Sequence, residues 1–234
     1  MSFEIYLESG PLHRKTWIYV PSLAGCSTVS PTTDDAMEAA RAAIRQRIGF
    51  LRDHGETYPD PEPIELAVAS HVIERKFLGF GQGVLASDVV PLTADEAASQ
   101  LRWAGWSRQE LVNAARSQPI PLAAKPAAGG RSTAAILSHV AEAEWSYVSS
   151  TLGTVAGRGA IMAAIAGAGD EPWAALAAER EALMERLRRM TPEELSRVTD
   201  RGPGKPARTA HRMLRRMLEH EWEHVLELRS RLGS

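Results

Sequence analysis

The chain has 234 residues, a formal net charge of −2 and one cysteine, Cys26. This charge balance excludes the strongly basic surface that is typical of nucleic-acid-binding proteins. A single cysteine excludes an internal disulfide framework and is typical of a reducing compartment. The sequence has no run of about 18 apolar residues, the length that a membrane span needs. We therefore expect a cytoplasmic protein with no nucleic-acid or membrane partner.

The first 75 residues show strand patterning interrupted by one helix. Phe3, Ile5 and Leu7 alternate with polar residues, which predicts a half-buried strand. Thr33, followed by two aspartates, is a typical helix cap. The further expected elements, in chain order, are strands at 17–20 and 27–30, a helix over 34–54 and a strand at 64–69.

The segment PSLAGCSTVSPTTDDAMEAARAAIRQRI resembles the HicB antitoxin-like family. The family pattern is a strand that ends in a Pro-x-x-x-Gly-Cys-like turn, a short strand, a Thr-led acidic cap and a helix. A proline-rich lead into a last strand follows, here YPDPEPIEL. The resemblance covers about residues 1–70 and implies a β-β-β-α-β unit akin to a partial RNase H fold, usually without catalysis. Such a domain would bind a protein partner. We expect Cys26 to be a packed residue, since its surroundings show no feature of a reactive thiol.

Residues 76–92 are expected to connect two domains, because glycines and Pro91 favour a connector there. From residue 93 onward the pattern is helical, and Thr93 and Glu96 have the spacing of a capping box. A short helix around Ile161 would lie in the long connection between the second and third long helices. The long helices are expected at 93–117, 132–152, 171–190 and 209–232. The fold class predicted for the chain is α+β, with an all-α up-down four-helix bundle over 93–234.

His220 and His224 lie four residues apart in LEHEWEHVLEL. Residues at this spacing project from one face of a helix, and neutral imidazole is a common metal ligand. A pair of this kind can chelate a metal if another element supplies a third ligand. His139 lies in ILSHVAEAEWSYV, early in the second long helix.

A histidine early in the second helix, followed by HxxxH late in the fourth, resembles the DinB/YfiT-like family of metal-binding four-helix bundles. The resemblance covers about residues 93–234 and implies that His139, His220 and His224 bind one divalent metal ion. Three imidazoles leave open coordination positions for water or substrate, as in catalytic metal sites. Zinc, nickel and iron all suit such a ligand set.

HEWEH also matches the H-E-x-x-H pattern of zinc proteases. Those enzymes generally take a third ligand from a position downstream. Here no histidine follows His224, and Ser230 stands where the extended H-E-x-x-H-x-x-G-x-x-H motif has its third histidine. Glu227 lies in the same helix as the pair. The sequence therefore disfavours a metalloprotease. The remaining histidines, which lack ligand spacing, are His13, His54, His71 and His211.

Glu221 and Glu144 fall within the apolar stripes of their helices, where a lone carboxylate is costly. Two interpretations stay open. Each carboxylate either pairs with an arginine of a neighbouring helix, or orients a ligand histidine or acts as a general base on metal-bound water. In the second case both are catalytic candidates. Glu142 is a weaker candidate and is expected to face solvent.

Two further groups of residues bear on the site. Trp145 and Trp222 lie near the histidines along their helices and are expected to pack or to line a pocket. A basic cluster is interpreted as a solvated helix start in preference to a phosphate or carboxylate site. Its members are Lys205, Arg208, Arg212, Arg215 and Arg216.

Characterised relatives of the DinB-like family include metal-dependent thiol transferases and isomerases that use low-molecular-weight thiols. The first hypothesis is therefore a metal-dependent enzyme for thiol transfer or hydrolysis at the three histidines. The second is a non-catalytic regulatory protein, in which the HicB-like part binds a partner and the bundle is a scaffold or metal sensor. We expect a homodimer in either case. An open cleft that reaches the histidines would favour the enzyme.

Overall fold

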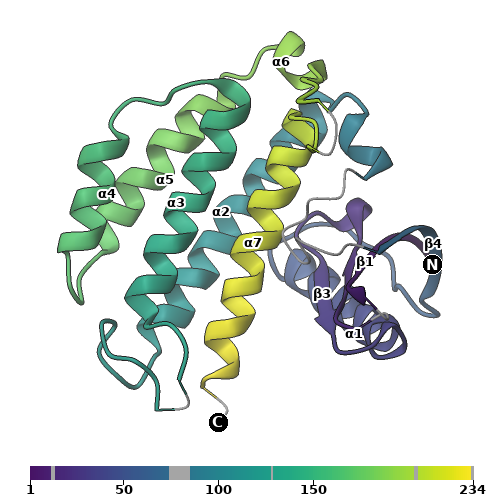
Figure 1. Cartoon of the computed structure of the whole chain (residues 1–234), viewed down its shortest axis with the longest axis horizontal. Helices are drawn as coiled ribbons and strands as arrows, with labels where there is room; N and C mark the ends of the chain where they lie inside the picture. The colour runs from purple at the N-terminus through teal and green to yellow at the C-terminus, as the bar shows by residue number, and fades with distance from the viewer. Residues whose placement is uncertain (12–13, 74–84, 128, 203–204, 233–234) are drawn as a thin grey trace.

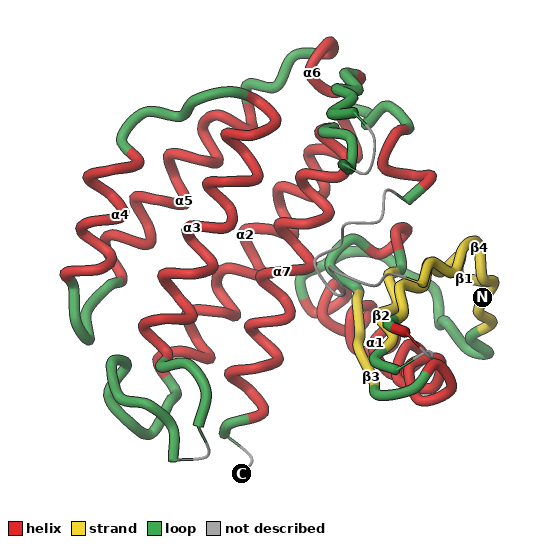
Figure 2. The backbone as a smooth tube through the Cα atoms, viewed as in Figure 1, coloured by secondary structure: helices red, strands yellow, loops and turns green. Residues whose placement is uncertain are grey.

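The computed structural model describes residues 1–11, 14–73, 85–127, 129–202 and 205–232. It is an α+β structure, in which an N-terminal sheet with one helix lies beside a larger, mostly helical part (Figure 1). The change from strands to helices along the chain is visible in Figure 2. Among the described residues, none of the helices combines the length and the apolarity that a membrane span needs.

The N-terminal part has the predicted strand-strand-strand-helix-strand order. Its sheet has the strand order β3-β2-β1-β4, with β1 antiparallel to β2 and parallel to β4. The side chain of Thr32 accepts a hydrogen bond from the backbone of Asp35, so Thr32, and not Thr33, caps the helix. The elements are β1 (Ser2–Ser9), β2 (Thr16–Tyr19), β3 (Ser27–Ser30), α1 (Thr33–Asp53) and β4 (Glu65–Ile73).

The prediction of a half-buried first strand is confirmed for the first half of β1, where Ser2 and Glu4 are exposed, and is wrong for the second half, which is buried on both faces. Ile5 and Leu7 face the core that α1 covers. On the opposite face Tyr6 is 7% exposed and Glu8 is 4% exposed. Tyr6 packs there in a second apolar cluster with Trp17, Tyr19 and Leu85. The second face of β1 is therefore covered at Tyr6 and Glu8, by aromatic side chains of β2 and by Leu85.

Four long helices form most of the second part. The last of them, α7, packs against α2 and α3, and α5 also packs against α2 and α3. The capping box predicted at the start of the first helix is present, with Thr93 and Glu96 exchanging hydrogen bonds of 2.9 and 3.2 Å. A short helix includes Ile161, as expected. The helices are α2 (Ala94–Arg116), α3 (Thr133–Leu152), α4 (Arg158–Gly167), α5 (Trp173–Arg188), α6 (Pro192–Ser196) and α7 (Ala210–Ser230).

The expected connector belongs partly to the packed structure. Residues 74–84 lie outside the described residues, and a short 3₁₀ helix, η3 (Ala86–Val89), follows them. Arg215 of α7 holds both carboxylate oxygens of Asp88, at 2.7 and 2.8 Å. Thr209 also donates a hydrogen bond to the Asp88 carbonyl, at 2.6 Å. These contacts fix the described end of the connector to the start of α7.

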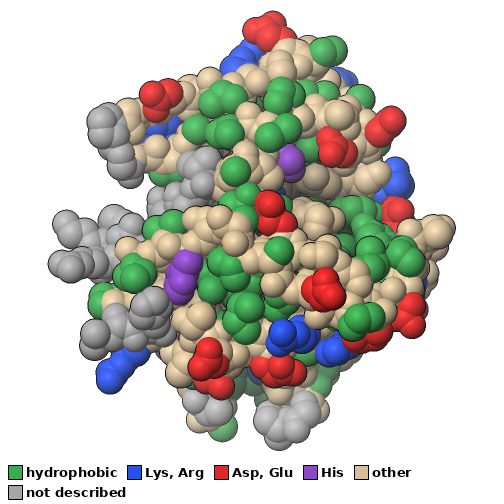
Figure 3. Space-filling model, turned by 90° about the vertical axis from the view of Figure 1, so that its right-hand side faces the viewer, with side chains coloured by type: hydrophobic (Ala, Val, Ile, Leu, Met, Phe, Trp, Pro, Cys, Tyr) green, Lys and Arg blue, Asp and Glu red, His purple; other side chains and the backbone are tan. Residues whose placement is uncertain are grey.

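The two parts share one hydrophobic core. Phe50 of α1 packs on Trp222 of α7, with 4.6 Å between ring centroids, and the Arg47 guanidinium lies 5.2 Å from the Trp222 ring. The Trp103 indole of α2 donates a hydrogen bond of 2.9 Å to Glu56, which follows α1. Trp222 and Trp145 are buried in cores, which is the packing role expected for them. Figure 3 shows the side that carries the sheet, where apolar side chains are interspersed with charged ones.

Cys26 is buried at the start of β3, as predicted. Burial raises the pKa of its thiol to about 12, although the nearby Arg47 opposes that effect. The turn before it depends on Gly25, whose φ is +89°. The Arg47 guanidinium crosses this turn and donates two hydrogen bonds to the Ala24 carbonyl, at 2.7 and 3.1 Å. A side chain on Gly25 would therefore meet Arg47.

We predict that Gly25→Ala destabilises the protein by about 1–3 kcal/mol, because it forces a strained backbone conformation. Its Cβ would also lie 2.7 Å from Arg47 Nη2. Gly49→Ala in α1 is the matched control, since a Cβ there meets nothing within 4 Å. The control should stabilise by about 0.4–1 kcal/mol. Urea unfolding of both variants checks this, and equal effects at the two sites would contradict it.

Candidate metal centre

His139 of α3 and the pair His220 and His224 of α7 meet at one point. One ligand atom from each lies within 4.8 Å of the others. The Nε2 atoms of His139 and His220 are 3.0 Å apart, and the ring centroids of His220 and His224 are 4.7 Å apart. His220 and His224 are buried, whereas His139 is exposed. The site therefore lies at the surface of the helical part, with one ligand open to solvent.

The donor set fits a divalent metal ion. Two nitrogens bound to tetrahedral zinc at roughly 2.0–2.1 Å are about 3.3 Å apart, which is close to the spacing of His139 and His220. Three imidazoles on two packed helices occupy one side of a coordination sphere and leave the other side open. The arrangement suits a site that binds water or a substrate group beside the protein ligands.

Glu227 positions His224. Nδ1 of His224 lies 2.7 Å from a Glu227 carboxylate oxygen, so a proton on Nδ1 is donated to Glu227 and Nε2 keeps its lone pair. The hydrogen bond from His224 lowers the pKa of Glu227. Arg231 and Arg131 hold the same carboxylate, at 2.7 and 3.4 Å. A carboxylate that orients a ligand histidine is common at metal sites. This role of Glu227 was missed from the sequence, where Glu227 was considered only as a third metal ligand and rejected, although its position three residues after His224 allows the contact.

The electrostatics favour the neutral form of two of the imidazoles, His139 and His220. Burial, helped by the neighbouring His224 and Arg216, lowers the pKa of His220 to about 2. Burial and the nearby Arg131 also lower the pKa of His139. Neutral imidazole is the form that binds metal, so protons do not compete for these nitrogens near neutral pH.

Glu144 and Glu221 pair with arginines, which is the first of the two interpretations left open by the sequence. Arg108 of α2 contacts Glu144 and Glu221 at 2.5 Å each and Glu179 at 3.1 Å. Arg180 of α5 contacts Glu144 at 3.0 Å and Glu221 at 2.5 Å. We name these five residues the central ion cluster. Each of the four long helices contributes to it, and all five side chains are buried.

The central ion cluster holds more acidic than basic groups. Burial raises the pKa of Glu144 to about 8 and outweighs Arg108 and Arg180, which lower it. Burial raises the pKa of Glu179 as well. The three carboxylates raise the pKa of Arg108 although burial alone would lower it. A proton on one carboxyl, which we assign to Glu144, would make the cluster neutral.

The interpretation of the basic cluster as a solvated helix start is wrong for two of its members. Arg215 is 2% exposed and Arg216 is 3% exposed. Arg215 pairs with Asp88 and Glu219, and Arg216 pairs with the same Glu219 at 2.9 Å. Their partners come from η3 and from the next turn of α7, so the helix start is covered by packed structure.

The remaining residues singled out from the sequence lie apart from the metal centre. Glu142 is exposed and pairs with Arg158, as expected for a solvent-facing residue. Among the described residues, the histidines outside the triad belong to no comparable cluster, and His13 lies outside the described residues. The described ones are His54, His71 and His211.

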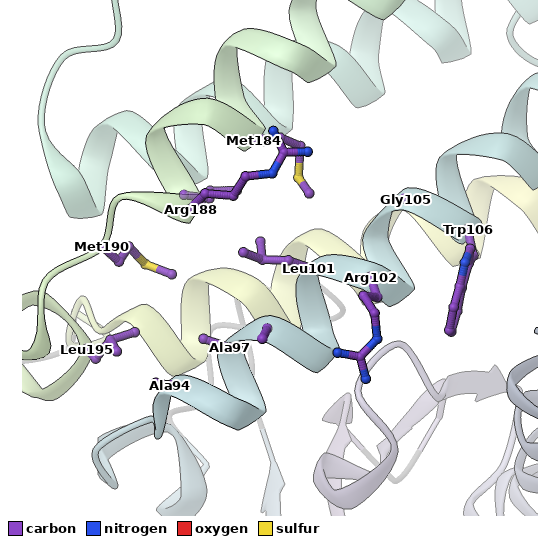
Figure 4. Close-up of a pocket in the computed structure, with 12 residues that line it drawn as sticks. Ala94, Ala97, Leu101, Arg102, Gly105, Trp106, Met184, Arg188, Met190 and Leu195 are labelled. Carbon is purple, nitrogen blue, oxygen red and sulfur yellow. The ribbon is translucent and has the colours of Figure 1, made fainter. Parts of the chain in front are cut away.

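A cleft of about 560 Å³ on the side of the sheet reaches one of the three histidines, His224. His224 and Glu227 of α7 line it together with Trp17 and Ser27 of the sheet and Arg131. Both parts of the chain therefore form its walls. A second groove, of about 520 Å³, lies between α2 and α5 (Figure 4). Alanine, leucine and methionine side chains line most of that groove, and it contains none of the three histidines.

The family model described as the DinB superfamily matches residues 104–228, just over half of the chain. The chain belongs to the DinB superfamily, whose domains are typically metal-binding, and the three histidines lie within the matched range. No curated protein and no solved structure compared with the chain matches it. The matched range excludes the N-terminal part, so the HicB-like resemblance has no support from these comparisons and stays a prediction.

We predict that the central ion cluster makes stability depend on pH. The folded-state pKa of Glu144, about 8, lies above the ordinary value of 4.5. The stability that the bound proton contributes is therefore fully present below 4.5 and is lost as the pH rises through about 8. The free energy of unfolding of the wild type should fall over this range. Glu144→Gln, which mimics the protonated carboxyl, should reduce that fall.

Two further variants separate charge from packing. Glu144→Ala should cost about 3–5 kcal/mol, because it removes one carboxylate partner from each of the two buried arginines, Arg108 and Arg180. Glu185→Gln, an exposed residue paired with Arg189, is the matched control and should change little. Urea unfolding between pH 5 and pH 9 supplies the measurement. A stability of Glu144→Gln that varies with pH as the wild type does would contradict the assignment of the proton.

Proposed function

We propose that the chain is a metal-dependent enzyme of the thiol transferase or hydrolase type, with His139, His220 and His224 as the metal ligands. The observation that carries the proposal is the convergence of three imidazoles, one of which, that of His224, lines a cleft open to solvent. A sealed site would have favoured a purely structural metal. The proposal includes the arrangement of α2, α3, α5 and α7 as the up-down four-helix bundle of the family.

The chain's own residues would bind and orient the reactants. Glu227 holds His224 in one tautomer, and Arg131 lies at the cleft wall beside it. Trp17 and Ser27 would contact a substrate that enters between the sheet and α7. A bound divalent metal would lower the pKa of a thiol or of water and hold the resulting anion. Glu144 and Glu221 are not assigned a catalytic role, because their hydrogen bonds run to Arg108 and Arg180.

We predict that His220→Ala abolishes metal binding while the helices stay folded. Loss of one ligand of three removes the chelate, whereas the apolar faces of the helices supply most of the stability. Elemental analysis of the purified protein and far-ultraviolet circular dichroism measure the two effects. His211→Ala is the matched control, since His211 lies on the same helix outside the triad. Loss of helical signal in His220→Ala alone would mean that the metal is structural.

Activity is tested by the consumption of free thiol. A low-molecular-weight thiol and a chloro-substituted fluorogenic acceptor are supplied; sulfur–carbon bond formation releases chloride and a proton. The wild type with metal should accelerate the reaction, and His220→Ala should return it to the rate without protein. An ester substrate screened in parallel tests the hydrolase alternative. Equal rates with and without metal would reject metal catalysis and favour the regulatory hypothesis.

A further inference from the structure

A basic cleft lies next to the metal centre along α7. It has a volume of about 380 Å³ and lies between the second half of α3, the loop that precedes α7 and the first turns of α7. Four arginines line it, and none of the other described residues in its lining is acidic. The arginines are Arg201, Arg208, Arg212 and Arg216, and the hydroxyl groups are those of Ser146, Tyr147, Ser150, Thr151 and Thr209.

The positive charge of this cleft is only partly neutralised. Arg216 is 3% exposed, and its Nη1 donates to Glu219 at 2.9 Å. Glu219 also receives two hydrogen bonds from Arg215, which binds Asp88 as well. No ion pair between described residues involves the other two arginines of this cleft, Arg201 and Arg208. Among the described residues, Nε of Arg216 has no hydrogen-bond partner although it is buried. Burial and the neighbouring Arg215 lower the pKa of Arg212. An anion in the cleft would reduce the repulsion between the arginines and accept a hydrogen bond from Nε of Arg216.

The cleft adjoins the proposed metal ligands. Arg216 lies one helical turn before His220 on α7. The ring of Tyr147, which lines the cleft, is 6.1 Å from the ring of His220 and meets it edge-on. A small molecule of ordinary size can therefore place one group near the metal ligands and another among the arginines.

We propose that this cleft binds a carboxylate or phosphate group of the substrate. This proposal rests on the proposed metal-dependent function, since it makes the anionic group part of a molecule that reacts at the three histidines. The guanidinium fork matches the oxygens of either anion, and serine and threonine hydroxyls donate to both. The substrate class is accordingly a small molecule with an anionic group, separated from its reactive atom by a short spacer.

The experiment measures the binding of inorganic phosphate and of succinate by titration calorimetry at low ionic strength. It uses the protein as purified and the His220→Ala variant, in which the metal ligand set is incomplete. Both proteins should bind at least one of the two anions, and the preferred anion identifies the group. Arg208→Ala should weaken binding at least tenfold. Arg208 is half-buried at the cleft. Arg189→Ala is the control, because it removes the same charge from an exposed residue outside the cleft.

The outcomes separate this proposal from the proposed function. Anion binding that survives in His220→Ala and is lost in Arg208→Ala supports the cleft, even if no metal is found. Binding that disappears in His220→Ala overturns it, because the anion would then be bound by the metal. Equal weakening by Arg208→Ala and Arg189→Ala, or no binding to the wild type, also overturns it. If Arg208→Ala fails to fold, the exposed Arg201→Ala takes its place with the same expectation.

Discussion

Five buried charged residues at the centre of the helical part fix how the long helices lie against one another. Arg108 and Arg180 bind three glutamates, and α2, α3, α5 and α7 each contribute at least one member. Removing such groups from water is costly, and the cost is recovered only where the geometry and the hydrogen bonds are good. A slip of one helix would leave charges unpaired in the core. The cluster therefore favours one register, whatever its net contribution to stability.

That register also places the metal ligands. Glu144 lies about one and a half turns after His139 on α3, and Glu221 lies between His220 and His224 on α7. When both carboxylates reach Arg108, the three histidines face one another at the surface. The other sides of α7 are also engaged, because Trp222 packs on α1 and Arg215 holds Asp88. One helix thus joins the core, the sheet and the metal centre.

The sequence predicts what depends on local patterning and leaves out what depends on distant partners. The order of strands and helices along the chain and the capping box at Thr93 follow from periodicity and cap chemistry. The triad was predicted from spacing and family resemblance. The burial of Arg215 was not predicted, since its partner Asp88 lies far along the chain. The contact between His224 and Glu227 could have been predicted from helical spacing, because the two residues lie three apart on one helix.

The central claim is that the register of α3 and α7 brings three imidazoles to one metal ion. X-ray absorption spectroscopy of the metal-loaded protein tests it most directly, because it counts and identifies the ligand atoms. For zinc, the account predicts three imidazole nitrogens at about 2.0–2.1 Å, with oxygen or nitrogen atoms completing the coordination shell. In a sample free of added thiol, a sulfur ligand at about 2.3 Å, or fewer than three imidazoles, would contradict it.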